Sequence, residues 1–366
     1  MKKTVYIHIG VHKTGTSTIQ NLLSNNRDVL KEQGIIYPGN KSAHHDMAKE
    51  FRTLPLEQIL KKNSRSQAYL REIIESPAEK SILSSEVFET LIFNAGKLRE
   101  FLPHDLEIKI IVYLRRQDDL LESKYNQRVR EPQIRLEKSF TDYFSSIGLY
   151  NPKLDYYNKL TPWADSFGKE NLIIRIYEKD KLRGNLFNDF ISVIGLENAD
   201  SIKVPDLAVN TSWSWDIIEF MRICNNSFRK DDGMHDFLLR SLAKARVVEK
   251  EKKRLLSPQQ RREIIAHYAD SNAKVAREYL GREDGRLFYA PLPNLDEPWE
   301  PNKGLTVEKV VPIFMQMLHN LDKEMNKRSH TKNILSKKSH FFNKITNNRF
   351  IQSKNVYSYF QKRNRR

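Results

Sequence analysis

The sequence of 366 residues contains a single cysteine, Cys224. One cysteine excludes an internal disulfide framework and a cysteine-based zinc cage, so a reducing compartment is expected. Cys224 lies in an apolar helical pattern, and we predict that it is a small core residue. Long apolar runs are also missing, because only a short apolar strand separates Met1 to Lys3 from His8 and Gly10. We therefore expect no signal peptide, no transmembrane helix and a cytoplasmic location.

Acidic residues are absent from one part of the chain. Residues 327–366 hold twelve of the 62 Lys and Arg residues and no Asp or Glu. The preceding 326 residues carry the other 50 basic residues against 46 acidic ones, so most of the net charge of +16 lies in the tail. This distribution argues against a duplex-binding surface on the body of the protein. We predict a domain over 1–326 and a basic, aromatic-containing tail over 327–366.

The tail interleaves its basic residues with aromatic and aliphatic ones, among them Phe341, Phe350 and Tyr357. Nucleic acid, an anionic membrane surface at the inner face of the membrane and an anionic glycan would all suit this composition. A solubilising tail without a partner is an equally good interpretation. We regard nucleic acid as the weakest of these alternatives, because the body is almost neutral.

Strand and helix patterns alternate along the first half of the chain. This alternation predicts an α/β fold with a mostly parallel central sheet that helices flank on both faces. The most apolar segment, Glu107 to Leu114, is expected to be buried on both faces of that sheet. A long helical region is expected from there to Gly168, and residues 205–325 form a helical C-terminal half. The predicted strands cover 5–9, 34–39, 81–86, 107–114 and 171–178.

The first strand runs into a short loop that contains two glycines. Gly10 and Gly15 keep the spacing of a nucleotide P-loop, and an apolar pattern with helical spacing begins at Ile19. A strand, a tight loop and a helix N-terminus direct backbone N–H groups and a helix dipole at one point, which suits a phosphate or sulfate group. The lysine differs from the P-loop pattern, because Lys13 precedes the second glycine and Thr16 occupies the usual lysine position.

A second polar segment follows the most apolar strand. Arg115 stands at the end of that strand, and Ser123 lies eight residues further along, about two turns into the next helix. An arginine at a strand end offers a fork of donors for a phosphate, and the serine hydroxyl could reach the same group. An arginine pair such as Arg115 and Arg116 is, by itself, usually a solvated surface feature.

Three further side chains are candidates for acid–base chemistry. Glu86 ends the predicted strand over 81–86, and ligands gather at the carboxyl ends of strands in open α/β sheets. Glu86 could equally begin a helix over Val87 to Leu98. His44 and His45 form a pair in a polar loop, where we expect a surface or substrate-lining role. No metal site is expected, because no further ligand lies at a useful spacing.

These motifs occur in the order found in a known family. The run His12 to Ser17 resembles the 5′-phosphosulfate loop of bacterial sulfotransferases that use 3′-phosphoadenosine 5′-phosphosulfate (PAPS), and Arg115 with Ser123 is similar to their 3′-phosphate motif. The likeness covers about 4–195, with a weaker likeness over 271–277, and it implies the P-loop-like sulfotransferase architecture. The family commonly has a proline where this chain has Gln117.

The resemblance also implies roles for individual residues. Arg115 and Ser123 would hold the 3′-phosphate of PAPS. Lys13 would stabilise the leaving oxygen and Glu86 would be the base, with His44 or His45 as the alternative. The acceptor would be a hydroxyl or an amine, most simply on a glycan or glycolipid. The implied 5′-phosphosulfate ligands are Lys13, Thr14, Gly15, Thr16, Ser17 and Thr18.

Two other functions compete with this interpretation. A P-loop kinase or other NTPase would need a lysine after Gly15 and an acidic Mg²⁺ ligand at a strand end, which Glu86 could imitate. A nucleic-acid-binding protein that acts through its tail would show a steeply salt-dependent affinity that vanishes when residues 327–366 are removed. Neither alternative explains the loop and the Arg115 segment together.

Overall fold

The computed structural model of the protein describes residues 2–11, 13–61, 63–149, 151–178, 180–196, 201–204, 213–227, 233–243 and 254–323. The chain divides into two compact units. The first combines Met1–Ser212 with Lys253–Lys303, and the second combines Trp213–Lys252 with Gly304–Arg366. The domain boundary predicted at residues 326 and 327 lies outside the described residues.

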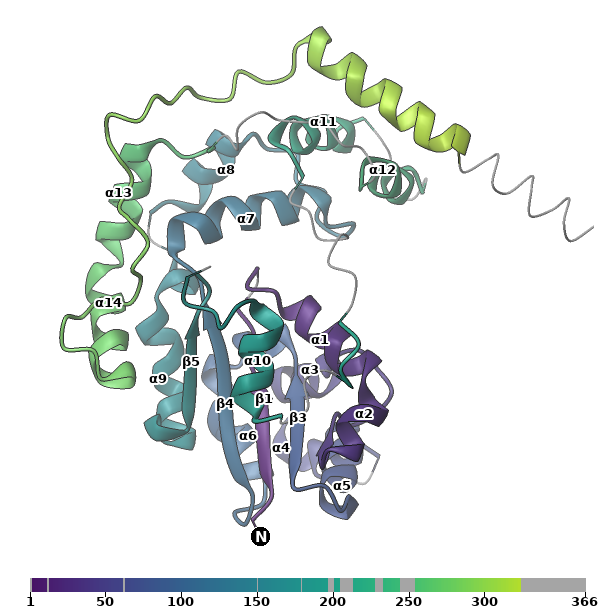
Figure 1. Cartoon of the computed structure of the whole chain (residues 1–366), viewed down its shortest axis with the longest axis vertical. Helices are drawn as coiled ribbons and strands as arrows, with labels where there is room; N and C mark the ends of the chain where they lie inside the picture. The colour runs from purple at the N-terminus through teal and green to yellow at the C-terminus, as the bar shows by residue number, and fades with distance from the viewer. Residues whose placement is uncertain are drawn as a thin grey trace, which may run out of the picture. The chain divides into compact units, whose positions relative to one another are not determined.

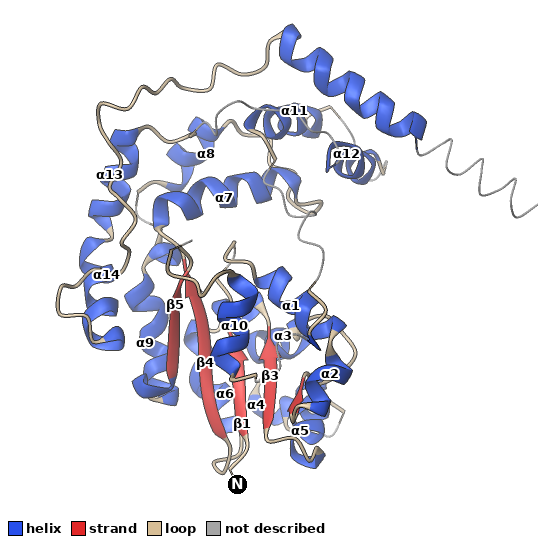
Figure 2. Ribbon diagram, viewed as in Figure 1, coloured by secondary structure: helices blue, strands red, loops and turns tan. Residues whose placement is uncertain are grey.

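The first unit is built on a five-stranded sheet in which all neighbouring strands are parallel (Figures 1 and 2). Its strand order is β2-β3-β1-β4-β5. The predicted α/β class and the mostly parallel sheet are therefore confirmed. The strands are β1 (Thr4–His8), β2 (Ile35–Ile36), β3 (Lys80–Ser84), β4 (Glu107–Leu114) and β5 (Leu172–Ile176).

The register of the strands places the ends of β1, β3 and β4 at one edge of the sheet. His8 lies beside Ser84 of β3 and Ile111 of β4, so β4 extends three residues beyond β1. The chain passes from β1 to β2 and β3 on one side and then crosses to β4 on the other. Ligands in such sheets bind outside the carboxyl ends of the strands, where the strand order reverses. The loop after β1 lies at this position.

Apolar residues cover both faces of the sheet, as expected for parallel strands. Ile110 and Val112 of β4 belong to one buried cluster, and Ile111 and Tyr113 belong to the other. The first cluster includes side chains of α3, α5, α6 and α9 (Tyr156–Phe167), and the second includes side chains of α1, α2 and α10 (Leu186–Ile194). The helices of the first unit up to β4 are α1 (Thr16–Asn25), α2 (Arg27–Glu32), α3 (His45–Thr53), α4 (Leu56–Ile59), α5 (Arg65–Glu75) and α6 (Ala95–Phe101), with 3₁₀ turns η1 (Glu86–Thr90) and η2 (Ile92–Asn94).

The long helical region predicted up to Gly168 is interrupted. The first helix ends at Arg130, just before Pro132, and new helices begin after Ser139 and Asp155. Both of these residues cap the helix that follows, since their side chains accept hydrogen bonds from backbone N–H groups of its first turn. The later helices of the unit are α7 (Gln117–Arg130), α8 (Phe140–Ile147), α9 (Tyr156–Phe167), α10 (Leu186–Ile194), α13 (Pro258–His267) and α14 (Ala269–Lys274), with short turns η3 (Pro152–Leu154) and η4 (Lys169–Asn171) and the π-turn η7 (Val275–Tyr279).

The described part of the second unit is helical. It contains α11 (Trp215–Asn225), α12 (Met234–Ala243) and a helix over 307–323. The apolar side chains of Ile217, Ile218 and Met221 on α11 are buried. Cys224 is half-buried rather than fully in the core, and burial raises the pKa of its thiol to about 11. Within the described residues, we find no helix that combines the length and the apolar character needed to cross a bilayer.

Candidate active site

The loop between β1 and α1 depends on its two glycines. Gly15 has a φ of 84° and is the N-cap of α1. A Cβ atom at this position would lie 2.1 Å from Leu186 Cδ2, so only glycine fits. Gly10 has a φ of 42°, and a Cβ there would approach the side chain of Thr16 and the backbone of Glu86. The glycines therefore allow the loop to fold tightly against two neighbouring segments.

The threonine side chains hold the loop from within. Thr14 is buried and its Oγ1 donates to the carbonyl of Val11 over 2.6 Å, while Thr16 Oγ1 approaches the same carbonyl at 3.4 Å. The N–H of Thr18 donates to the carbonyl of Gly15. The backbone donors that the loop can offer to an anion therefore come from residues before Thr18, at the positive end of α1.

Lys13 is held in a sparsely populated backbone conformation, with a φ of 69°. Burial lowers the pKa of its ammonium from 10.5 to about 8, and the positive charges of Arg130 and Arg115 act in the same direction. The carboxylate of Glu86 acts against this decrease. Lys13 is thus a partly desolvated cation that faces both further cations and a carboxylate.

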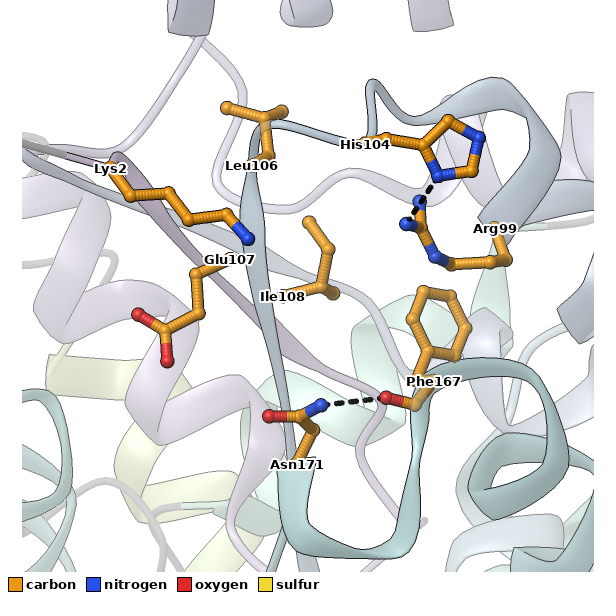
Figure 3. A pocket seen from close by; sticks show the side chains of 8 residues that line it. All are labelled: Lys2, Arg99, His104, Leu106, Glu107, Ile108, Phe167 and Asn171. Carbon is orange, nitrogen blue, oxygen red and sulfur yellow. Dashed lines mark hydrogen bonds between the residues drawn. The ribbon is translucent and has the colours of Figure 1, made fainter.

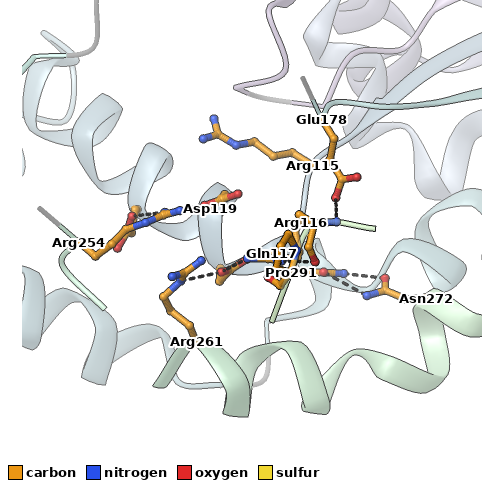
Figure 4. A network of polar contacts seen from close by, with 12 residues as sticks. Arg115, Arg116, Gln117, Asp119, Glu178, Arg254, Arg261, Asn272 and Pro291 are labelled. Atoms are coloured by element: carbon orange, nitrogen blue, oxygen red, sulfur yellow. Dashed lines mark hydrogen bonds and ion pairs between the residues drawn. The ribbon is translucent and has the colours of Figure 1, made fainter. Parts of the chain in front are cut away.

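Arg115 and Arg116 have different partners, although they are adjacent in the sequence (Figure 4). Arg116 is buried and binds Asp118 through two nitrogens, at 2.8 and 3.0 Å, and its Nη1 donates to the carbonyls of Ala290 and Pro291. Arg115 is half-buried. Its Nη1 donates to the carbonyl of Lys13 over 3.3 Å, and its guanidinium carbon lies 5.9 Å from the centre of the Tyr177 ring. Arg115 therefore faces the loop and Arg116 supports the fold.

The first turns of α7 are anchored by buried polar contacts (Figure 4). Asp118 accepts a second bond from Arg261, at 2.9 Å. Gln117 exchanges two amide bonds with Asn272, at 2.8 and 3.2 Å. Gln117 thus joins α7 to the 271–277 segment. Ser123 lies half-buried two turns into this anchored helix.

Glu86 begins the 3₁₀ turn η1 after β3. The predicted α-helix over Val87 to Leu98 is wrong, because two 3₁₀ turns precede α6. Ser85 is the cap of η1, since its Oγ accepts the N–H of Val87 over 3.1 Å. Glu86 itself is half-buried and interacts electrostatically with Lys13. The structure therefore brings a carboxylate from the end of β3 to the loop after β1.

Helix α9 supports both Glu86 and Arg115. Lys159 of α9 forms a buried ion pair with Glu89 of η1. Tyr156 of the same helix donates its hydroxyl hydrogen bond to the carbonyl of Arg115. The two contacts connect the turn that carries the carboxylate with the strand end that carries the arginine.

The two adjacent histidines differ. His44 is buried, its Nδ1 accepts from the N–H of Ser84 at 3.0 Å, and its Nε2 lies 3.0 Å from the carbonyl of Pro38. Burial lowers its pKa to about 4. The surface or substrate-lining role expected for His44 is therefore wrong, because backbone groups occupy both ring nitrogens. His45 is half-exposed, with Nδ1 2.7 Å from Ser85 Oγ, and remains an alternative base.

Two residues near the loop were not identified from the sequence. Tyr177 follows β5 and lies beside Arg115, and Arg130 ends α7 and acts on Lys13. Arg130 is seven residues after Ser123, so helical spacing could have indicated that both lie on one face of α7. No pattern in the sequence indicates Tyr177, because its contact with Arg115 arises only when β4 pairs with β5.

A polar pocket lies at the other edge of the sheet (Figure 3). It includes Glu107 and Ile108 at the start of β4, together with Arg99 and His104, whose side chains are 3.0 Å apart. Because open α/β sheets bind ligands at the carboxyl edge, we assign no function to this pocket. Within the part of the chain that the structure describes, no cluster of three or more His, Cys, Asp or Glu residues could hold a metal ion.

The chain is similar to known proteins in sequence and in structure. No protein-family model matches the chain. An uncharacterized protein of Archaeoglobus fulgidus is 30% identical over 210 residues, which are 56% of this chain and 54% of that protein, so the chain spans about half the length of this relative. A crystal structure of a sulfotransferase from Alicyclobacillus acidocaldarius matches 76% of this chain and 96% of its own, with 18% identity and a TM-score of 0.39. At that score the likeness carries no functional argument.

Proposed function

We propose that the protein transfers a sulfuryl group from PAPS to a hydroxyl or an amine of an acceptor. The observation that carries this proposal is the contact between Arg115 and the Lys13 carbonyl, which brings the two sequence motifs to one place. PAPS carries a phosphosulfate at one end and a 3′-phosphate at the other, so its site needs anion-binding groups at both ends. The β1–α1 loop and the strand end after β4 supply such groups side by side.

The residues present suit this donor. The position of Gly15 allows the loop to approach an anion closely, and Lys13 and Arg115 add two cations beside it. A kinase lysine after Gly15 is absent, since Thr16 is there and its hydroxyl points back to Val11. These features favour sulfuryl transfer over phosphoryl transfer.

The expected reaction is an in-line displacement at sulfur. The acceptor oxygen or nitrogen forms a bond to sulfur while the bond from sulfur to the bridging phosphate oxygen breaks, leaving adenosine 3′,5′-bisphosphate. Glu86 takes the acceptor proton, and the Lys13 ammonium stabilises the charge that grows on the bridging oxygen. Such a cation is most effective where water is excluded, and Lys13 is partly desolvated.

For the acceptor we propose a glycan or a glycolipid. The basic tail over 327–366 supports this class, because its charge would attract an anionic glycan or the anionic membrane surface in which a glycolipid lies. The tail lies outside the described residues, so the support comes from its composition alone.

Mass spectrometry of candidate acceptors incubated with PAPS and the protein tests this function. We expect a sulfated glycan or glycolipid together with adenosine 3′,5′-bisphosphate, and neither product with Lys13→Ala. Phosphorylated product from ATP and Mg²⁺, with no reaction from PAPS, would instead identify a kinase.

A further inference from the structure

Helix α7 carries a polar stripe beyond the residues assigned above. Ser123, Asn126 and Arg130 are spaced i, i+3 and i+7, so they lie on one face of the helix. The distance from the first to the last is about 10 Å along the helix axis. Figure 1 shows α7 crossing the carboxyl ends of the strands, above the loop after β1. Arg130, the last residue of the stripe, acts electrostatically on Lys13, so the stripe reaches the candidate site.

Asn126 indicates that this face meets a ligand. Its side chain is 8% exposed, and its Oδ1 has no hydrogen-bond partner among the described residues. A buried acceptor without a hydrogen bond is unfavourable, so such atoms are uncommon in folded proteins. A bound molecule with a hydroxyl group would satisfy this oxygen.

Arg130 brings a third cation to the loop. The charged groups that act on Lys13 are Arg130 from α7, Arg115 from the end of β4 and Glu86 from the start of η1. Of the two arginines, Arg130 has the larger effect. Burial also lowers the pKa of Arg130, so its charge is partly removed from water. Desolvated like charges that face each other are unfavourable unless an anion lies between them.

We propose that Arg130 is a further catalytic residue, whose guanidinium contacts the non-bridging oxygens of the sulfuryl group, while Asn126 Oδ1 accepts a hydrogen bond from a ribose hydroxyl of the donor. This inference rests on the proposed function. Asn126 lies one turn from Ser123 and one turn from Arg130. Ser123 would hold the 3′-phosphate and Arg130 the sulfuryl group, so Asn126 would lie between these two ends of the donor. An acceptor oxygen cannot bind a phosphate or sulfuryl oxygen, so the hydroxyl is its natural partner.

The test compares transfer from PAPS with binding of adenosine 3′,5′-bisphosphate, which lacks the sulfuryl group. Arg130→Ala should lower turnover roughly 100-fold, as loss of one transition-state contact does, and should leave bisphosphate affinity nearly unchanged. Arg130→Lys should recover part of the turnover. The matched control is Arg128→Ala, because Arg128 is exposed, lies on the same helix and faces Tyr143 instead. It should behave like the wild type.

A pH profile separates a catalytic Arg130 from a structural one. On the basic side of the pH profile, kcat/KM should fall as Lys13 loses its proton. Removing the positive charge of Arg130 should raise the pKa of Lys13, so this fall should move to higher pH. If Arg130→Ala does not fold, Arg130→Gln keeps most of the length and hydrogen bonding and is measured in its place. Unchanged turnover, or equal losses in turnover and bisphosphate affinity with an unshifted limb, would overturn the inference. A wild-type protein that neither binds the bisphosphate nor uses PAPS would overturn the proposed function itself.

Discussion

The Arg115 guanidinium donates a hydrogen bond to the backbone carbonyl of Lys13 over 3.3 Å. This bond joins two segments that are 102 residues apart, the loop after β1 and the end of β4. The contact uses the carbonyl of Lys13, so the Lys13 ammonium stays available for a ligand. Most of the donors of the Arg115 fork are likewise not engaged by this one bond. The pair is therefore arranged to bind an anion rather than to neutralise a carboxylate.

Substitutions of the two adjacent arginines should have different consequences. Arg116→Ala removes a partner of buried Asp118 and two carbonyl contacts, so the free energy of unfolding should fall by about 3 kcal/mol. Arg115→Ala removes one long hydrogen bond at a half-buried site and should cost less than about 1 kcal/mol. Urea unfolding followed by circular dichroism measures both values. Equal losses of stability would show that Arg115 is also structural.

Activity should decrease as the pH rises through about 8, because Lys13 must be protonated to stabilise the leaving oxygen. The sign follows from the lowered pKa, since the charged form is lost above it. The limb should be visible in kcat/KM, which reports the free enzyme. Lys13→Arg keeps the charge at every accessible pH, so its residual activity should lack this limb. A limb that persists near pH 8 in Lys13→Arg would assign the titration to another group.

Glu86→Gln should lower turnover by about 100-fold or more and leave bisphosphate affinity intact, because it removes basicity while keeping the shape of the side chain. Steady-state kinetics with PAPS and an acceptor provide the measurement. The matched variant is His45→Gln, which removes the half-exposed histidine beside Ser85. Near-normal turnover in Glu86→Gln together with inactive His45→Gln would transfer the role of base to His45.

Gly15→Ala should lower the free energy of unfolding by roughly 3 kcal/mol. The positive φ accounts for about 1–2 kcal/mol, and the clash with Leu186 adds the rest. Gly34→Ala provides the control, since Gly34 has a φ of 72° and no atom within 4 Å of the added Cβ. It should show the backbone cost alone. Equal losses in the two variants would mean that Leu186 moves aside without cost.

The sequence predicted the sheet and the loop well because each has a strong local signal. Apolar β-branched runs indicated β1, β3 and β4, and the spacing of Gly10 and Gly15 reflects backbone conformations that the structure contains. The contacts that distinguish Arg115 from Arg116 were not predictable. Arg116 binds Asp118, and Asp118 also binds Arg261, which is 143 residues away. Ion pairs at such separations leave no periodic pattern in the sequence.

The burial of His44 was missed for a similar reason. It lies in a polar stretch of sequence, but its partners are the backbone of Ser84 and Pro38 and the rings of Tyr37 and Tyr69. Those contacts form because the folded chain places the segment before α3 against the end of β3. Asn126 and Arg130 share a helix face with Ser123. Their place in the candidate site could be inferred only from the structure, in which the end of α7 acts on Lys13.

The most direct test of the donor assignment is the thermal stabilisation of the protein by adenosine 3′,5′-bisphosphate compared with adenosine 5′-monophosphate. A ligand that binds the folded state raises the melting temperature, and at equal concentration the tighter ligand raises it more. If Arg115 and Ser123 hold a 3′-phosphate, the bisphosphate should raise the melting temperature clearly and the monophosphate only slightly, and Arg115→Ala should abolish the difference. Equal shifts with both nucleotides in the wild type would contradict the 3′-phosphate site and with it the assignment of PAPS as the donor.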